Sequence, residues 1–177
     1  MTREDSTNFR QALSKFPTGV TVVTGRSPST SQPVGLTVSS FNSVSLNPKL
    51  VLWSLSSVSK HLEAFLPGQA HRIHVLSTTQ TELAIRFARS GSDKFSGLEI
   101  RQIRIPQQTD RAIESIPALP DCCVRFDCIT ENTYAAGDHS IIIARVLHFE
   151  TGDREPLLFA HGSFFSLLGM QTSREEL

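Results

Sequence analysis

The sequence predicts a mainly β fold, an antiparallel barrel or sandwich whose ends are closed by short helices. Short runs rich in β-branched residues recur along the chain, separated by Gly, Pro, Ser and Asn. The helical patterns between them are too few and too short for a regular βαβ alternation. With 177 residues, 39% of them hydrophobic, the chain has enough apolar material for one packed domain over residues 1–177.

The first part of the chain predicts one helix and three strands. Phe9, Leu13 and Phe16 recur at helical spacing, and Pro17 and Gly19 follow them. We therefore expect a short amphipathic helix that ends before Pro17. The strands are expected over Thr18 to Thr24, Val34 to Phe41 and Lys49 to Leu55.

Two short helices and a fourth strand are expected in the middle of the chain. Ser59 can begin a helix that runs to Phe65, and the fourth strand covers Ile73 to Ser77. Thr79 and Glu82 have the spacing of a capping box, which predicts a helix beginning there. Its apolar face holds Leu83, Ala84, Phe87 and Ala88.

The last part of the chain predicts a loop and three strands. The stretch from Arg101 to Pro120 is polar and contains three prolines, so we expect it to cross the surface. Strands are expected over Cys122 to Cys128, Ser140 to Phe149 and Leu157 to Ala160. In the first of these strands one face is predicted to be apolar, formed by Cys122, Val124, Phe126 and Cys128.

Charge and composition exclude several classes of protein. Lys plus Arg and Asp plus Glu number 17 each, whereas nucleic-acid-binding proteins carry a basic excess. No run approaches the roughly 18 apolar residues of a membrane span. The polar start at Met1 is unlike a signal peptide, and Cys122, Cys123 and Cys128 do not form a disulfide framework. A cytoplasmic protein without a nucleic-acid or membrane partner is expected.

Familiar catalytic motifs do not occur in the sequence. There is no GxGxxG, no GxxxxGK[ST] and no GxSxG. The histidines lack the spacing of metal ligands, so we expect no metal.

Two local patterns favour a binding site. Hydroxyl side chains are dense over 37–45 and again after Trp53. They are typical of the outer face of a barrel strand, or of a wall of donors for a phosphate and the edge of a planar ring. Lys94 is a candidate cation for such a phosphate. Gly137-Asp138-His139 precedes a long apolar strand, where His139 is either a turn residue or an imidazole that meets a mobile ligand.

Taken in chain order, these pieces resemble the flavin reductase family, which has the FMN-binding split β-barrel fold. The matching blocks are Phe9-Arg10, Phe16 to Thr24, Gly35 to Pro48, Leu83-Ala84, Phe87-Ala88, Asp93 to Gly97, Gly137 to His139 and Pro156 to Phe159. The resemblance implies a six- to seven-stranded antiparallel Greek-key split barrel with a few short helices.

The resemblance also implies which residues hold the ligands. The expected flavin-binding residues are Thr37, Val38, Ser39, Ser40, Ser43, Trp53, Ser54, Leu55, Ser59, Phe87, Lys94 and Phe95. Gly137, Asp138 and His139 match the segment that the family associates with NAD(P)H, His139 positioning the nicotinamide nucleotide.

The sequence departs from the family pattern at four places. Trp53 stands where a small residue or Cys is common, so an indole would stack on the flavin ring or crowd it. Ser59-Lys60-His61 replaces a Ser-x-Thr pair, and His74 replaces a common Asn. Ser163-Phe164-Phe165 follows Gly162, where Arg or Tyr is usual.

By resemblance, the protein is an NAD(P)H:flavin oxidoreductase. It would transfer a hydride from NADH or NADPH to FMN or FAD and supply reduced flavin to a partner monooxygenase, as a cytoplasmic homodimer with the flavin near the subunit interface. The transfer runs between the two rings, so no catalytic acid or base is expected. Two alternatives stay open: a flavin-binding redox sensor or carrier without turnover, and a flavin oxidase of the pyridoxamine-phosphate type.

Overall fold

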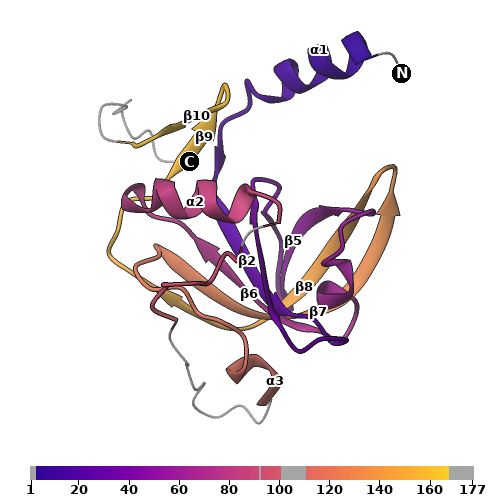
Figure 1. Cartoon of the computed structure of the whole chain (residues 1–177), viewed down its shortest axis with the longest axis vertical. Helices are drawn as coiled ribbons and strands as arrows, with labels where there is room; N and C mark the ends of the chain where they lie inside the picture. The colour runs from indigo at the N-terminus through magenta and orange to yellow at the C-terminus, as the bar shows by residue number, and fades with distance from the viewer. Residues whose placement is uncertain (1–2, 92, 101–110, 168–177) are drawn as a thin grey trace.

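The computed structural model describes residues 3–91, 93–100 and 111–167. Two antiparallel sheets dominate it (Figure 1). The larger sheet has seven strands in the order β3-β2-β6-β7-β8-β5-β4, and the smaller one has the order β1-β9-β10. The predicted mainly β fold is therefore confirmed.

The bounds of the elements follow the chain. The strands are β1 (Thr18–Gly19), β2 (Thr21–Arg26), β3 (Pro33–Val38), β4 (Asn42–Leu46), β5 (Lys49–Ser56), β6 (Ala70–Val75), β7 (Val124–Ala136), β8 (His139–Thr151), β9 (Leu158–Ala160) and β10 (Ser163–Phe165). The helices are α1 (Arg3–Leu13), α2 (Thr81–Ala88) and α3 (Arg111–Glu114), with 3₁₀ turns η1 (Leu62–Phe65) and η2 (Thr78–Gln80).

The larger sheet curls around an apolar core. Buried side chains of β2, β3, β5, β6 and β8 meet in one cluster that also takes in η1. At its centre the rings of Trp53 and Phe65 pack edge to face, with centroids 4.9 Å apart. Because the strands that supply the cluster come from both halves of the sheet, its burial closes the sheet on itself.

Strand β4 is not among the strands expected from the sequence. The predicted strand from Val34 to Phe41 ends at Val38, and a new strand begins at Asn42. Strand β4 pairs with β5, with a register shift between Ser43 and Ser45. Its side chains are mostly exposed, so it lacks the apolar alternation by which a strand is recognised.

The helix after β6 also begins differently from the prediction. The capping box joins Ser77 to Gln80, whose Oε1 accepts the main-chain N–H of Ser77 at 3.0 Å. The predicted box between Thr79 and Glu82 is therefore wrong by two residues. The 3₁₀ turn η2 comes first, and α2 starts only at Thr81.

The segment before β7 is buried rather than exposed. Ile113, Ile116, Ala118 and Leu119 are nearly inaccessible to solvent, which contradicts the predicted surface crossing for residues 113–120. Residues 101–110 of that prediction lie outside the described residues. The segment is tied to the sheet at His74, whose Nε2 accepts the N–H of Leu119 at 3.1 Å while its Nδ1 lies 3.0 Å from the carbonyl of Val22. Burial lowers the pKa of His74 to about 3, so the ring is neutral and Nδ1 donates.

A buried ion pair lies beneath this segment. Arg72 of β6 donates through Nε to Oδ1 of Asp127 on β7 at 2.6 Å, and both side chains are fully buried. Arg72 also donates to the carbonyl of Ile116. Arg125, on the same face of β7 as Asp127, is buried as well. Phe126 and Cys128, on the opposite face, pack in the apolar core, so the predicted apolar face is confirmed for these two residues. Both faces of β7 are therefore covered. The segment before β7 excludes water from the ion pair, which a pair this deeply buried requires.

Helix α2 packs closely against β3. A Cβ atom at Gly35 would lie only 2.4 Å from Cε1 of Phe87, so the ring of Phe87 occupies the space of a side chain. The Oγ1 of Thr37 donates to the carbonyl of Ala84 at 2.6 Å. These contacts set the separation of the helix from the strand.

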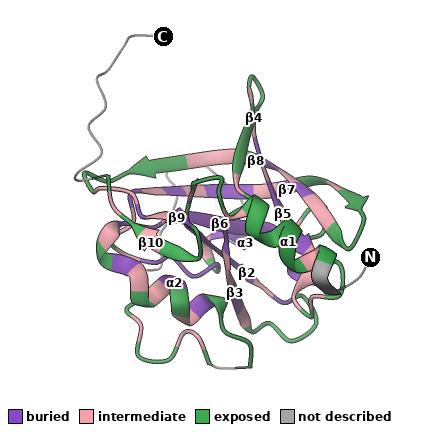
Figure 2. Ribbon diagram, turned by 90° about the horizontal axis from the view of Figure 1, so that it is seen from above, coloured by how far each residue is buried: buried purple, intermediate pink, exposed green. Residues whose placement is uncertain are grey.

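Helix α1 stands away from the two sheets (Figure 1), and its described residues are mostly coloured as exposed (Figure 2). Phe9, Leu13 and Phe16 form the predicted apolar stripe, yet all three side chains are more than half exposed. None of the helices in the described ranges is long and apolar enough to cross a membrane.

We predict that Gly35→Ala lowers the free energy of unfolding by about 1–3 kcal/mol, because the new methyl group overlaps the buried ring of Phe87. Urea denaturation measures the loss. Gly19→Ala is the matched control, since a Cβ there meets nothing within 4 Å. It should change stability by less than about 0.5 kcal/mol, and an equal effect of the two variants would contradict the close packing of α2.

Candidate functional site

A cavity of about 890 Å³ lies between β3, the loop after β5, and the end of α2 with its following loop. It brings together six residues that the sequence placed in the flavin site: Thr37, Leu55, Ser59, Phe87, Lys94 and Phe95. They come from segments almost 60 residues apart in the chain, so the packing of α2 on β3 assembles the cavity.

Part of the lining of the cavity is apolar. Leu36, Leu55, Val58 and Phe95 contribute to it, and the ring of Phe95 meets the fully buried ring of Phe87 edge to face, with centroids 5.1 Å apart. The side chain of Val58 is 92% exposed. Such a wall suits a flat apolar ring rather than a fully polar ligand.

Lys94 occupies the junction of strand and helix. Its Nζ donates to the carbonyl of Gly35 at 2.9 Å and to the carbonyl of Phe87 at 2.8 Å. The second carbonyl belongs to the last turn of α2, where the helix dipole attracts a cation. Burial and then the charge of Lys60 lower the pKa of Lys94. Because an ammonium group has three donors, these two bonds within the described chain leave one N–H for a ligand.

The charged lining of the cavity is mainly positive. Lys60, Arg89 and Lys94 line it, against the one carboxylate of Asp93. Asp93 Oδ1 is already engaged, accepting the main-chain N–H groups of Phe95 and Ser96 at 3.1 and 3.2 Å. The cationic side chains therefore outnumber the carboxylate, and the hydroxyl of Ser59 lines the same cavity, a set that suits an anion.

The remaining predicted residues of β3 to β5 lie around the cavity or inside the barrel. Val38 and Trp53 are buried in the core, and Trp53 has no exposed surface, so the structure does not bring the indole to the cavity. Ser40 and Ser54 contact each other, because Ser40 Oγ accepts the main-chain N–H of Ser54 at 2.9 Å. The last two of the predicted set, Ser39 and Ser43, are exposed near the turn into β4.

The Gly137-Asp138-His139 segment forms the tip of the hairpin between β7 and β8. Gly137 has φ +65°, a conformation that favours glycine. His139 pairs in register with Ser56, which lines the cavity, so the hairpin tip adjoins the cavity. The imidazole is half-exposed, and its Nδ1 lies 2.7 Å from Oδ1 of Asp138. This hydrogen bond lowers the pKa of Asp138 and orients the ring.

Sequence reasoning missed two parts of the cavity. Arg89 follows the last residue of α2, and nothing in its sequence position distinguishes it from a surface arginine. Gly35 belongs to one of the matching blocks, but the sequence gives no sign that the absence of a side chain there admits Phe87. The next residue, Leu36, lies on the opposite face of the strand from Gly35 and Thr37 and packs against the barrel core.

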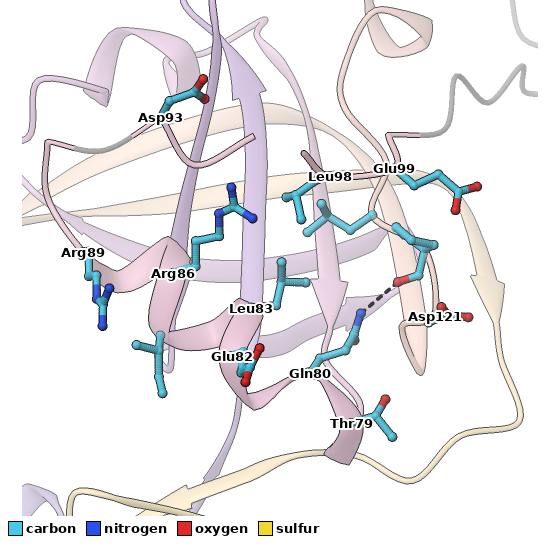
Figure 3. Close-up of a pocket in the computed structure, with 13 residues that line it drawn as sticks. Thr79, Gln80, Glu82, Leu83, Arg86, Arg89, Asp93, Leu98, Glu99 and Asp121 are labelled. Atoms are coloured by element: carbon cyan, nitrogen blue, oxygen red, sulfur yellow. Dashed lines mark hydrogen bonds between the residues drawn. The ribbon is translucent and has the colours of Figure 1, made fainter. Parts of the chain in front are cut away.

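A second cavity, of about 870 Å³, opens on another side of α2 (Figure 3). Its carboxylates are Glu82, Asp93, Glu99 and Asp121, against Arg86 and Arg89. Gln80 Nε2 donates a hydrogen bond to the carbonyl of Pro120 at 2.8 Å. The excess of carboxylates disfavours an anionic ligand, so the first cavity is the better candidate for a phosphate.

Comparison with known proteins places the chain among flavin reductases. A family model described as flavin reductase like domain matches residues 13–168. A protein of Agrobacterium fabrum named FMN reductase (NADH) SmoA is 42% identical over 163 residues, which cover 91% of this chain and 86% of that protein. A Rhizobium meliloti protein named "Probable flavin reductase" is 37% identical over 162 residues, or 92% of this chain, and the chain spans only 49% of its length.

A solved structure shares the architecture. It is a nitrilotriacetate monooxygenase component B homologue from Mycobacterium thermoresistibile, with a TM-score of 0.84 and 25% sequence identity. The match covers 98% of this chain and 93% of that one.

We predict that Lys94→Met lowers the free energy of unfolding by roughly 1.5–3 kcal/mol, because two carbonyls lose a charged donor. Thermal and urea denaturation measure the change. Lys49→Met is the control. Lys49 begins β5, at the end of the strand away from the cavity, and its Nζ lies 5.9 Å from the ring centre of Phe149. This substitution should lower the free energy of unfolding by less than about 1 kcal/mol. Equal losses would show that Lys94 does not join α2 to β3.

Proposed function

The chain belongs to the flavin reductase like family and is an NAD(P)H-dependent flavin reductase, and we propose that flavin and nicotinamide meet in the cavity between β3, β5 and α2. One observation carries this proposal: the cavity gathers an apolar wall and a cationic end from three separate segments of the chain. FMN and FAD both combine a flat ring with a phosphate, so either ligand suits this pairing of surfaces.

The cavity residues have separate roles in this proposal. Leu36, Leu55 and Phe95 contact the ring, while Ser59 and Lys94 bind the first phosphate with the remaining donor of the ammonium group. The main chain at Thr37 to Ser40 runs along the polar edge of the ring. Trp53 contributes from inside the barrel, where it holds Phe65 and the strand in place.

His139 positions the nicotinamide nucleotide. It stands one strand away from the cavity, on a turn whose Asp138 carbonyl accepts the N–H of Ser57 at 2.9 Å. A bound flavin would supply the hydride acceptor and the nicotinamide the donor, so the residues of this chain would hold the two rings without acting as acid or base. The chain therefore acts by orientation, holding the two rings at about 3–3.5 Å.

A flavin-dependent monooxygenase is the inferred recipient of the reduced flavin. The support is the structural neighbour, which is named as component B of a monooxygenase. In such a system the reductase releases its product to a second protein, and the open cavity rim at Val58 permits that release.

A second copy of the chain is the inferred cover of the exposed apolar side chains. Phe9 and Leu13 on α1 and Phe16 just after it are exposed, and Val58 is exposed at the cavity itself. Exposed apolar side chains that cluster on a surface mark an association site. A homodimer would bury them and close the open side of the cavity.

The thiols favour the cytoplasm as the location of this activity. Cys122, Cys123 and Cys128 are free, and burial raises the pKa of Cys122 to about 12. Thiols that stay reduced and protonated are typical of proteins in a reducing compartment.

Anaerobic stopped-flow absorbance tests the proposed function. With purified protein, FMN or FAD, and NADH or NADPH, we expect the oxidised-flavin band to bleach rapidly with at least one pair of substrates. The pair that reacts fastest identifies both substrates. Flavin that binds without bleaching would instead support a redox carrier or sensor.

We predict that His139→Ala weakens the use of NAD(P)H, raising its KM about tenfold, because the side chain that orients the nucleotide at the hairpin tip is lost. The flavin dissociation constant, measured by fluorescence titration, should stay nearly unchanged and serves as the internal control. Equal loss of both functions would show that His139 is a structural turn residue.

A further inference from the structure

His61 lines the cavity together with the cationic side chains of Lys60 and Lys94. It is half-buried and lines the cavity next to Ser59 and Lys60. Its main-chain N–H lies 3.3 Å from Ser59 Oγ, which holds this loop in a turn just before η1. The position of the imidazole is therefore set by the same loop that presents Ser59.

The charges around His61 are mainly positive. Burial lowers its pKa first, followed by the charges of Lys60 on its own loop and Lys94 on the loop after α2. Arg89 and Asp93, from the end of α2 and its loop, complete the charged lining of the cavity. With the cavity free of an anion, the imidazole is neutral at neutral pH.

A phosphate bound among these groups would favour the protonated form of His61 instead of the neutral form. A dianion close to the imidazole favours the protonated ring, and it also offsets the repulsion by Lys60 and Lys94 that disfavours protonation. His61 can thus gain a proton from the solvent as the anion enters. The neutral ring avoids adding a fourth positive charge to the empty cavity, beside Lys60, Arg89 and Lys94.

We propose that His61 binds the phosphate of the flavin nucleotide and takes up a proton when it does so, which makes the affinity for FMN depend on pH. The proposal rests on the proposed function, because it needs flavin in this cavity. A proton gained on binding strengthens binding at low pH and is lost as the pH rises above the pKa of His61 in the complex. The phosphate of FMN loses its own second proton near about pH 6, which acts in the opposite direction. A variant without the imidazole separates the two effects.

The test compares FMN with riboflavin, which lacks the phosphate, in the full-length wild-type protein, in His61→Asn and in a control. His161→Asn is the matched control, since His161 is exposed in a turn with φ +49°, a conformation that asparagine tolerates. Dissociation constants come from fluorescence titration between about pH 6 and about pH 8, a range across which histidine charge changes. Calorimetry in two buffers of different ionisation enthalpy counts the protons taken up.

We expect the ratio of the FMN dissociation constants, His61→Asn over wild type, to be about 3- to 10-fold larger at the low end of this range than at the high end. Proton uptake should be larger for wild type than for His61→Asn. His161→Asn should follow wild type, and riboflavin should bind all three proteins alike.

Identical pH dependence in wild type and His61→Asn would overturn the proposal, as would equal affinity of wild type for FMN and riboflavin. Bleaching of bound flavin by NADH, followed in the same samples, reports on the proposed function separately. A protein that reduces flavin but shows no difference at His61 refutes only the role of His61. A protein that binds no flavin refutes both.

Discussion

The cavity depends on the way one ammonium group joins a strand to a helix. Lys94 Nζ donates to the carbonyl of Gly35 on β3 and to the carbonyl of Phe87 at the end of α2. A partly buried cation is costly unless its donors are satisfied, and here two carbonyls and the negative end of the helix satisfy them. The close approach at Gly35, where Phe87 takes the place of a side chain, lets both carbonyls reach the same nitrogen.

The same arrangement determines which ligand the cavity can accept. Helix α2 separates two cavities of similar size, and their charges differ. Carboxylates dominate one, whereas the other combines Lys60, Arg89 and Lys94 with a single Asp93 that is already bonded to the main chain. A nucleotide phosphate is therefore directed to the side of α2 that faces β3, where Phe95, packed on the buried ring of Phe87, offers an apolar surface for the ring.

Much of the fold could be predicted from local patterns, because runs of β-branched residues mark β2 and β8, and the alternation of apolar residues marks β5. Strand β4 escaped prediction because its serines and asparagine resemble a turn, and only its pairing with β5 makes it a strand. The burial of Ile113 and Ile116 was not predicted, because their neighbours in the sequence are charged residues and prolines, which are typical of an exposed loop. Their burial follows from the ion pair of Arg72 and Asp127, whose partners lie 55 residues apart.

The family resemblance predicted the flavin reductase assignment, which the family model and the relatives confirm. Among the expected site residues, Thr37, Leu55, Ser59, Phe87, Lys94 and Phe95 line one cavity. Trp53 does not line it, because it stands in the middle of the inward face of β5, which it shares with Leu55, and is fully buried in the barrel core.

The crystal structure of the protein with FMN tests the central claim most directly. We expect the phosphate within hydrogen-bond distance of Lys94 Nζ and the hydroxyl of Ser59, with the ring against Leu36, Leu55 and Phe95. Density for FMN in the cavity lined by Glu82, Leu98 and Asp121, on the other side of α2, would contradict it.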